Sequence, residues 1–279
     1  MTGHVTSMRQ APRVTRTETV AREPGEGLAH LFDLELDDVA PDGALPPLWH
    51  TVYLLERPRQ SDLGPDGHPY HGLPPSPGAS ARRMFAGGRV SFTTPLRIGA
   101  DATRTSEVVA RAEKQGRSGP LTFVTVRHRI DQDGPVVEAE DDIVYRPSDA
   151  SSRIRRPVEP NVPPGTDLWG LTVDATLLFR FSALTYNAHR IHYDREWCAK
   201  EGYAGLVVHG PLQVLLIAEA LRREGTSLWG RRLDYRLVSP LVGEQDVTVR
   251  RGDDGRLVVV GRERVVTAEA TIRALDDGR

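Results

Sequence analysis

The chain contains little cysteine, little lysine and no long hydrophobic run. Cys198 is the single cysteine among 279 residues, which excludes an internal disulfide and a metal cluster held by cysteines. The longest strongly apolar run covers residues 212–218, far fewer than the ~20 residues that span a bilayer. Residues 1–20 are polar and lack the apolar segment of a secretory signal. We therefore expect a cytoplasmic protein that has no membrane partner.

An excess of charge of one sign is lacking as well. The formal net charge is -2, which offers nothing that would attract nucleic acid or an anionic membrane. Basic charge is almost all arginine, since Lys114 and Lys200 are the only lysines. We interpret the arginine clusters as solvated surface, with one of them available to CoA phosphates or to an acidic carrier protein. The remaining balance, 39% hydrophobic and 27% charged residues, is that of a globular protein with a core.

Two stretches rich in proline divide the chain. The stretch Gly64–Pro77 has too much proline and glycine for a helix or a central strand and is interpreted as a connector. The stretch 146–165 has five prolines beside an arginine cluster and lies near the middle of the chain, where an interdomain linker is expected. We predict a flexible N-terminus over 1–24, an N-terminal half over 25–150, a linker over 151–164 and a C-terminal half over 165–279.

The two halves show a weak internal repeat. Gly88–Phe92 leads to the pair Pro95-Leu96, and Gly230–Tyr235 leads to the pair Pro240-Leu241, 145 positions further on. Alternating apolar and polar residues follow each pair and predict antiparallel strands that are buried on one face. In the first half these strands are 107–112, 121–130 and 136–145, and in the second half they are 246–251, 257–266 and 267–275.

One segment departs from the β pattern. Gly210–Arg223 is apolar on most sides and has Pro211 in its first turn, which predicts a buried helix. One helix wrapped by a curved antiparallel sheet is the hotdog arrangement. The best helix candidate in the first half is Leu48–Leu55, so we expect that half to be degenerate. The predicted fold class is α+β, a double hotdog of two fused halves, each an antiparallel sheet around a helix, with the sheets joined edge to edge so that fewer strand edges stay unpaired.

Residues capable of acid–base chemistry gather in one segment of the second half. Phe181–Asp194 reads FSALTYNAHRIHYD, and the apolar run 177–184 before this polar cluster is interpreted as a strand. Asp194 is expected to cap a short helix over Arg195–Lys200 that Gly202 ends. The chain then returns through an apolar segment and enters the long helix at Gly210.

This segment resembles the motif of the MaoC-like hydratases, in particular their hydroxyacyl-thioester dehydratase type 2 branch, which includes mesaconyl-CoA hydratases. That motif reads approximately Phe-x-x-Leu-[Ser/Thr]-x-Asp-x-Asn-Pro-[Ile/Leu]-His, followed later by a Val-His-Gly helix start. The matching residues are Phe181, Leu184, Thr185, Ile191, His192 and Val208-His209-Gly210. The stretches 82–89 and 116–121 also look like this branch, so the resemblance covers most of the chain beyond about residue 30.

The resemblance implies a reaction. It is the reversible, (R)-specific hydration of a 2-enoyl thioester to a 3-hydroxyacyl thioester, which makes the protein a hydro-lyase. The resemblance implies no metal or redox cofactor, since CoA or phosphopantetheine enters as part of the substrate. The implied partner is a small-molecule acyl thioester, with an acyl carrier protein as the open alternative to CoA and a second copy of the chain as a candidate for a homodimer.

The motif departs from the wider family at one critical position. Asn187 stands where the family has its catalytic aspartate, and a neutral amide cannot accept a proton in the working pH range. His192 is therefore left as the proton-transfer group, with Asn187 positioning water or the imidazole. Gly210 is expected to bring the thioester close to a helix start whose N–H and dipole stabilise the enolate-like oxygen. His192, Asn187 and Gly210 are thus assigned to catalysis, and His189, Arg190 and His209 to substrate binding.

Three alternatives stay open at this point. A hotdog thioesterase would use a helix carboxylate, for which Glu219 is the candidate, although we expect Glu219 at an exposed helix edge. An acyl-binding module without activity would explain the loss of the family aspartate at Asn187. The histidines of the segment are potential metal ligands, but no HExxH spacing supports this, and we predict no metal.

Overall fold

One antiparallel sheet of ten strands runs through the computed structural model, which describes residues 13–74, 81–116, 119–147 and 160–275. The strands of the first half are β1 (Arg13–Thr19), β2 (Ala81–Phe92), β3 (Asp101–Gly116), β4 (Gly119–Asp131) and β5 (Pro135–Pro147). Those of the second half are β6 (Gly165–Val173), β7 (Arg231–Leu237), β8 (Gln245–Gly252), β9 (Leu257–Val260) and β10 (Val266–Ala274).

The two halves meet at the pairing of β2 with β7. Residues 87–92 pair antiparallel with residues 231–236, which are the two segments of the internal repeat. The strand order is β1-β3-β4-β5-β2-β7-β10-β9-β8-β6, so the halves read alike when counted outward from this junction. The prediction of two halves joined edge to edge is confirmed, and the double hotdog follows from it.

The strands predicted from alternation are found, with one correction. In the first half the three predicted strands lie within β3, β4 and β5. In the second half the predicted strand 257–266 is instead β9, a turn closed by a hydrogen bond from Arg264 N to Gly261 O, and the start of β10. The polar run 261–264 between two apolar runs supplies the turn that the prediction overlooked.

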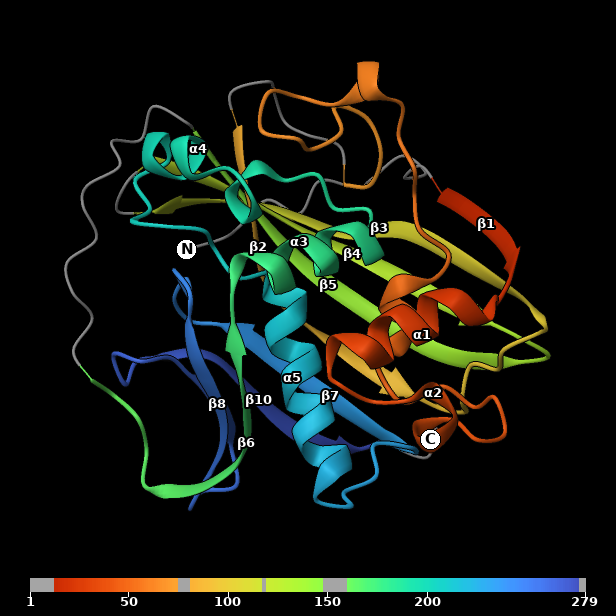
Figure 1. Ribbon diagram of the computed structural model, residues 1–279. Coiled ribbons are helices and arrows are strands. Elements are labelled where there is room, and N and C mark those ends of the chain that lie inside the picture. Colours follow the sequence, from red (N-terminus) through yellow and green to blue (C-terminus); the bar gives the residue numbers. More distant parts are fainter. Residues whose placement is uncertain (1–12, 75–80, 117–118, 148–159, 276–279) are drawn as a thin grey trace.

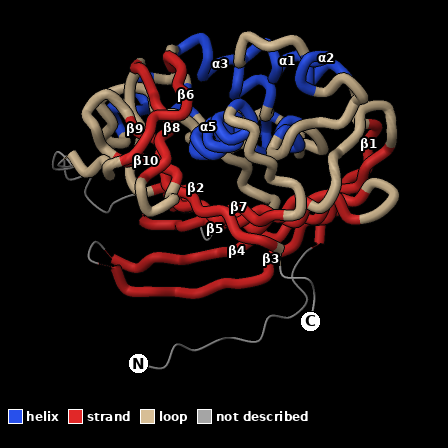
Figure 2. The backbone as a smooth tube through the Cα atoms, turned by 90° about the horizontal axis from the view of Figure 1, so that it is seen from below, coloured by secondary structure: helices blue, strands red, loops and turns tan. Residues whose placement is uncertain are grey.

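Helices lie on one side of the curved sheet (Figure 2). The predicted central helix is confirmed as α5 (Gly210–Arg223), and residues 212–221 are all buried. It packs against β6, β8, β9 and β10 and also reaches β2 (Figure 1). Its first residue, Gly210, lies against Phe85 of β2 and Leu237 of β7, which places the start of the helix beside the junction of the two halves.

The helix of the first half is not where the sequence predicted it. Leu48–Leu55 contains only the short 3-10 helix η1 (Trp49–Val52), and the helix over this half is α1 (Arg22–Leu31), followed by α2 (Leu36–Val39). Residues 13–24 are therefore not a flexible tail, because they form β1 and the start of α1, while residues 1–12 lie outside the described ranges. Helix α1 has two glycines and few apolar residues, so its sequence pattern is weak.

The run 177–184 is a helix rather than a strand. It belongs to α3 (Ala175–Leu184), whose start is capped by Asp174, with its carboxylate accepting from Leu177 N at 2.7 Å. Helix α3 packs against α1 of the other half. The expected short helix is confirmed as α4 (Arg195–Lys200), capped by Asp194 through Trp197 N at 2.9 Å.

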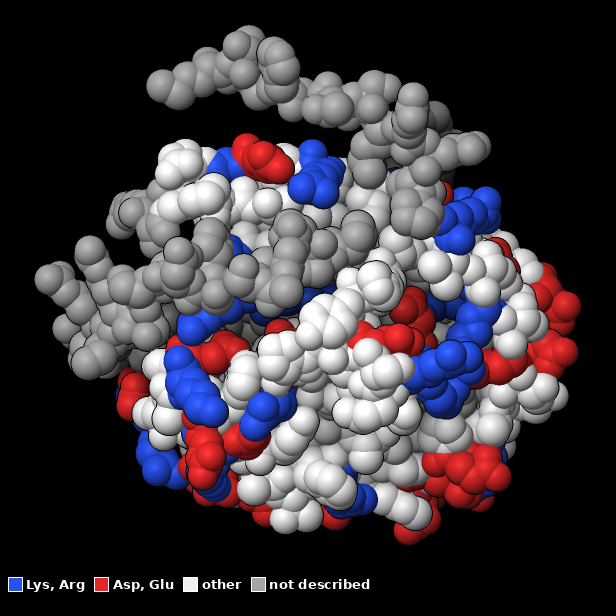
Figure 3. Space-filling model, turned by 90° about the horizontal axis from the view of Figure 1, so that it is seen from above, with Lys and Arg blue, Asp and Glu red and all other residues white. Residues whose placement is uncertain are grey.

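The remaining elements are short, and the predicted boundaries are covered in part. They are η2 (Gln60–Asp62) and η3 (Arg190–His192). The predicted linker 151–164 lies mostly outside the described residues, and β6 begins at Gly165, where the second half was predicted to begin. On the face shown in Figure 3, basic and acidic side chains lie beside one another rather than in a patch of one sign. Within the described ranges, no helix is both long and apolar enough to cross a membrane.

Candidate active site

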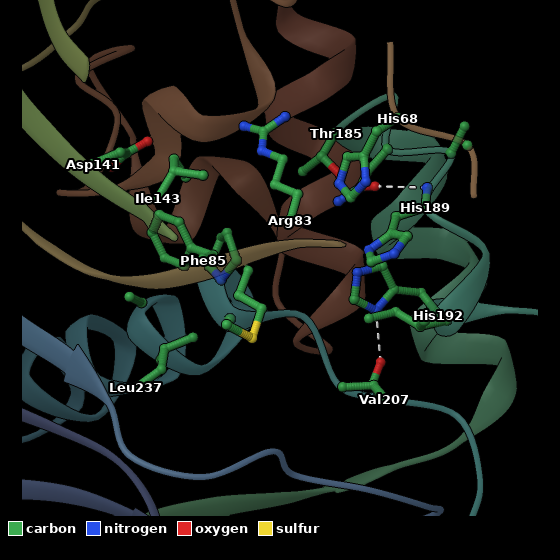
Figure 4. A pocket seen from close by; sticks show the side chains of 18 of the residues that line it. His68, Arg83, Phe85, Asp141, Ile143, Thr185, His189, His192, Val207 and Leu237 are labelled. Carbon is green, nitrogen blue, oxygen red and sulfur yellow. Dashed lines mark hydrogen bonds between the residues drawn. The ribbon is translucent and has the colours of Figure 1, made fainter. Parts of the chain in front are cut away.

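A pocket of about 560 Å³ lies where the two halves meet. Its wall combines the start of β2, the loop 63–73, the α3–η3 segment, the start of α5 and the end of β7. The first half thus supplies Arg83 and Phe85, and the second half supplies the motif residues (Figure 4). A volume of this size accommodates an acyl group and a thioester, and the lining comes from segments far apart in sequence.

Four histidine rings follow one another at this pocket. The ring centroids are 4.0 Å apart for His68 and His189, 5.4 Å for His189 and His192, and 3.6 Å for His192 and His209. Such close imidazoles disfavour one another's protonation, because like charges at this distance repel. One of these four imidazoles, which we call the row of histidines, can therefore become protonated only where a neighbouring group stabilises its positive charge.

His192 is held in one orientation and one tautomer. Its Nδ1 lies 2.7 Å from the carbonyl O of Val207, and because a carbonyl can only accept, Nδ1 carries the hydrogen and Nε2 keeps a lone pair. Burial lowers the pKa of His192 to about 4, opposed by the Val207 bond. The ring is neutral at physiological pH and presents an acceptor to the pocket wall. Its side chain is buried and also lines the pocket.

His189 and His209 differ in their access to the pocket. His189 lies on the pocket wall, whereas His209 is fully buried behind His192, with Nε2 2.9 Å from Ser182 Oγ. Burial lowers the pKa of both rings well below the ordinary value. The structure thus corrects the assignment of His209 to substrate binding, because its ring supports His192 from the side away from the pocket.

Arg190 contacts other residues of its own loop and of α4 rather than the pocket. Its guanidinium contacts Asp194 through Nε at 2.9 Å and Nη2 at 2.5 Å, and it stacks on Trp197 with its carbon 4.3 Å from the ring centre. Arg190 does not line the pocket among the described residues. Its predicted substrate contact is therefore replaced by a role in fixing the loop that carries His189 and His192.

Asn187 lines the pocket. It also fixes the conformation of the loop between α3 and η3, residues 185–189, which we call the motif loop. Its Oδ1 accepts from His189 N at 3.0 Å, and its own N–H donates to Ser182 O at 2.8 Å. The side-chain oxygen is thus engaged in an Asx turn, and Nδ2 is the group left for a water molecule or a substrate oxygen. This geometry refines the predicted role, since Asn187 positions the loop as well as any bound water.

Substitutions at Asn187 separate these roles. Asn187→Ala removes the Asx turn, and we expect kcat to fall about 10-fold or more, because the acceptor for His189 N is lost. Asn187→Asp keeps that acceptor and adds a carboxylate, which raises the pKa of nearby imidazoles and moves the acid limb of the pH–rate profile to higher pH. Kinetics of both variants on one enoyl thioester, with circular dichroism as the folding control, test this. Wild-type profiles for both would exclude Asn187 from the site.

Gly210 opens α5 at the pocket wall. A Cβ at this position would lie 2.3 Å from Leu237 Cδ1 and 2.8 Å from Phe85 Cδ1, both on residues that line the same pocket. A glycine is therefore needed for the helix start to approach the pocket closely. The N–H groups of the first helical turn have no acceptor within the helix, so they are available to a substrate oxygen.

The sequence analysis missed two residues that line the pocket, His68 and Arg83, and it missed Asp66, the hydrogen-bond partner of His68. Asp66 and His68 lie in the stretch interpreted as a connector, and Arg83 lies in β2. The available signal was the presence of ionisable residues inside a turn rich in glycine and proline. Donor atoms of Asp66, His68 and His189 lie within 4.8 Å of one another, which is close enough for three ligands of a divalent cation.

Glu219 does not face the pocket. It is fully buried in α5 rather than exposed at the helix edge, and it forms ion pairs with Arg222 at 2.6 Å and Arg223 at 2.8 Å. Both oxygens are used in these contacts. The observation that would favour a thioesterase, a helix carboxylate facing the thioester, is thus not met by Glu219.

Comparison with known proteins agrees with this description. A family model for hydroxyacyl-thioester dehydratase type 2 matches residues 48–243. The chain is 48% identical over 238 residues to the mesaconyl-C(4)-CoA hydratase of Chloroflexus aurantiacus, covering 82% of this chain and 83% of that protein. A MaoC-like dehydratase from Phytophthora capsici has a TM-score of 0.67 at 16% identity, covering 95% and 97% of the two chains. A Mycobacterium tuberculosis protein described as a double hotdog fold has a TM-score of 0.54 at 13% identity, covering 96% of each chain.

The fold, the pocket and these matches define a double-hotdog hydro-lyase of acyl thioesters. The chain belongs to the hydroxyacyl-thioester dehydratase type 2 family. Its reaction is the reversible hydration of a 2-enoyl thioester to a 3-hydroxyacyl thioester, as the motif resemblance implied.

Proposed function

We propose that the substrate is a CoA thioester whose unsaturated acyl group carries a free carboxylate. The name of the Chloroflexus aurantiacus relative denotes such a compound, a CoA ester of a branched unsaturated dicarboxylic acid. The observation that carries the proposal is the guanidinium of Arg83, which enters the pocket from β2 (Figure 4). Arg83 has no ion pair or hydrogen bond to a side chain or backbone atom of the described residues.

A guanidinium that has no partner among the described residues and lies in a pocket is suited to bind an anionic ligand. Burial is the main cause that lowers the pKa of His68 and of His189, and the charge of Arg83 lowers both further, so Arg83 lies close to the row of histidines. A carboxylate on the acyl group would neutralise this charge and accept two parallel hydrogen bonds from one guanidinium. The same contact would fix the double bond relative to the histidines, because the carboxylate is attached directly to the reacting carbon chain.

The rest of the pocket supplies the chemistry of hydration. The N-terminus of α5 at Gly210 holds the thioester oxygen, which gains negative charge when water adds to the β-carbon. The Nε2 lone pair of His192 accepts a hydrogen of the attacking water, and Asn187 keeps the loop beneath it in place. These roles need no metal or redox cofactor, and the new hydroxyl carbon is expected to have the (R) configuration by family resemblance.

The proposal also includes the carrier of the acyl group, the oligomeric state and the location in the cell. CoA is preferred over an acyl carrier protein because the relative with 48% identity is a CoA hydratase by name. We further propose a homodimer in solution and a cytoplasmic location. Gel filtration with light scattering measures the first, and cell fractionation measures the second.

Arg83→Gln tests the substrate class. We expect kcat/KM for mesaconyl-C(4)-CoA to fall about 10- to 100-fold, the value of about 1.5–3 kcal/mol of a hydrogen bond to a charged group. Hydration of crotonyl-CoA, which has no second carboxylate, should change less than about 3-fold, because it has nothing to offer the guanidinium. The decrease in enoyl absorbance measures both rates. Equal losses on the two substrates would show that Arg83 acts on the fold rather than on a substrate carboxylate.

A further inference from the structure

Hydration requires a group that takes a proton from water and holds it briefly. The family carboxylate is replaced by Asn187, and the hydrogen-bond partner of His192 among the described residues is a backbone carbonyl, Val207 O. With a pKa of about 4, His192 is a poor base, although it is a good acceptor of a hydrogen bond. The row of histidines must therefore contain a better-supported imidazole if one of its members is to carry the proton.

His68 is the imidazole that has a carboxylate partner. Its Nδ1 lies 3.0 Å from Asp66 Oδ2, and its backbone N–H donates to Asp66 Oδ1 at 3.0 Å. Burial opposes ionisation of Asp66, but the hydrogen bonds from His68 hold the pKa of this carboxyl below its ordinary value. Asp66 is thus a carboxylate that accepts from Nδ1–H, and the neutral His68 ring keeps its lone pair at Nε2.

The loop of the first half is clamped onto the motif loop of the second half. Arg190 N donates to Asp66 O at 2.8 Å, and Arg190 Nη1 donates to Pro65 O at 3.1 Å. Gly67 has a φ of +90° and lies so close to the motif loop that a Cβ would be 1.8 Å from Ala188 O. The clamp places the His68 ring 4.0 Å from that of His189, on the wall of the same pocket.

We propose that His68, oriented by Asp66, is the general base of the reaction and that Asp66 is its positioning residue. This inference rests on the proposed function, and it assigns proton transfer to the first half of the chain, which the motif does not include. His192 then has a complementary task, since its Nε2 accepts the second hydrogen of the same water.

The step balances within the site. As the water oxygen bonds to the β-carbon, one O–H bond breaks and its proton moves to His68 Nε2, while the π electrons move onto the thioester oxygen. The resulting imidazolium is stabilised by the Asp66 carboxylate, as in other carboxylate–imidazole pairs. The enolate then collapses, and the α-carbon takes the proton from His68. One proton travels from water to the α-carbon, and His68 returns to its neutral form.

The same three donors could instead hold a cation. Asp66, His68 and His189 satisfy the spacing, but the Nδ1 of His68 already bonds Asp66, and the positive charge of Arg83 acts on both histidines. A cation would have to overcome this repulsion. We therefore infer a proton-transfer pair, and a metal requirement is one outcome of the test.

The decisive variant is His68→Asn, which keeps an amide donor at the position of Nδ1 and removes Nε2. We expect kcat to fall at least about 10². His71→Asn is the matched control, because His71 is exposed and lies outside the pocket wall, and it should keep wild-type activity. In His68→Ala, added imidazole should restore part of the turnover. Full activity of a folded His68→Asn enzyme would overturn the proposal, whereas failure of the wild type to hydrate any enoyl-CoA would overturn the proposed function itself.

Asp66→Asn gives a readout that a structural role would not produce. Burial lowers the pKa of His68; of the charged groups that act on it, Asp66 and Glu201 raise its pKa and Arg83 lowers it, and the His189 ring lies beside it. Removing the Asp66 charge lowers the pKa of His68, so kcat should fall and the acid limb of the kcat/KM profile should move to lower pH. An unchanged profile would contradict the proposal. So would activity that disappears in EDTA and returns with Zn²⁺, because this outcome would identify a metal site.

Discussion

Replacing His192 with asparagine is expected to lower kcat by about 10³ while the chain stays folded. The amide nitrogen of asparagine occupies the position of Nδ1, so the bond to Val207 O, 2.7 Å in the wild type, has a donor in the variant. The group that is lost is Nε2, the acceptor for the attacking water. Because the ring also stacks on His209, we expect a stability loss of about 1–3 kcal/mol, measured by thermal melting.

A control for this variant is available directly behind the ring. Ser182→Ala removes the partner of His209 Nε2 without touching the pocket wall. It should cost stability of about 1 kcal/mol and change kcat less than about 3-fold. If His192→Asn turns over like the wild type, or if Ser182→Ala is equally inactive, His192 has no direct part in the reaction.

The parts of the fold that were predicted correctly have strong sequence patterns. Helix α5 has ten consecutive buried residues, all apolar except Gln213 and Glu219, and strands β3, β4 and β5 alternate regularly. A helix that is buried on most sides is apolar on most sides, and a strand that faces the core on one side alternates between apolar and polar residues. The sequence predicted that the sheets of the two halves join edge to edge, and in the structure the strands that contain the two repeat segments, β2 and β7, form this junction.

The errors fall where the pattern was short or diluted. Helix α3 is a short apolar run, for which strand and helix periodicity cannot be told apart, and the cap by Asp174 was the deciding signal. Helix α1 buries only four residues, two of which are leucines, so the helical spacing of its apolar residues is weak in the sequence. It packs against α2, η1 and α3, and contacts between elements of this kind leave no local pattern in the sequence.

The same distinction applies to the site. His192, Asn187 and Gly210 all line the pocket, and the sequence analysis singled them out because they belong to the motif segment and to the helix start that follows it. Asp66 and His68 were missed because they are more than a hundred positions away, and they come close to His189 only through a loop clamped by backbone contacts. Arg190 and His209 were assigned to substrate because motif position does not reveal which way a side chain faces.

Gly210→Ala is expected to reduce kcat/KM by about 10²–10³, the effect typical of losing an oxyanion contact. Alanine keeps the backbone N–H, so this variant changes the shape of the helix start and leaves its donor. The new Cβ would lie 2.3 Å from Leu237 Cδ1 and 2.8 Å from Phe85 Cδ1, and both side chains line the pocket. Whichever of them moves, the wall next to the thioester is displaced. Overpacking of this kind costs about 1–3 kcal/mol of stability.

Gly205→Ala is the matched control for this change. A Cβ at Gly205 would meet its nearest neighbour, the Cα of Gly243, at 3.5 Å, which is an ordinary contact. This variant should keep its activity and its melting temperature. Adding Leu237→Ala to Gly210→Ala makes room for the new methyl group and should recover part of kcat/KM if crowding is the cause. Wild-type kinetics for Gly210→Ala alone would show that the thioester does not approach the start of α5, and the oxyanion site would then have to lie elsewhere in the pocket.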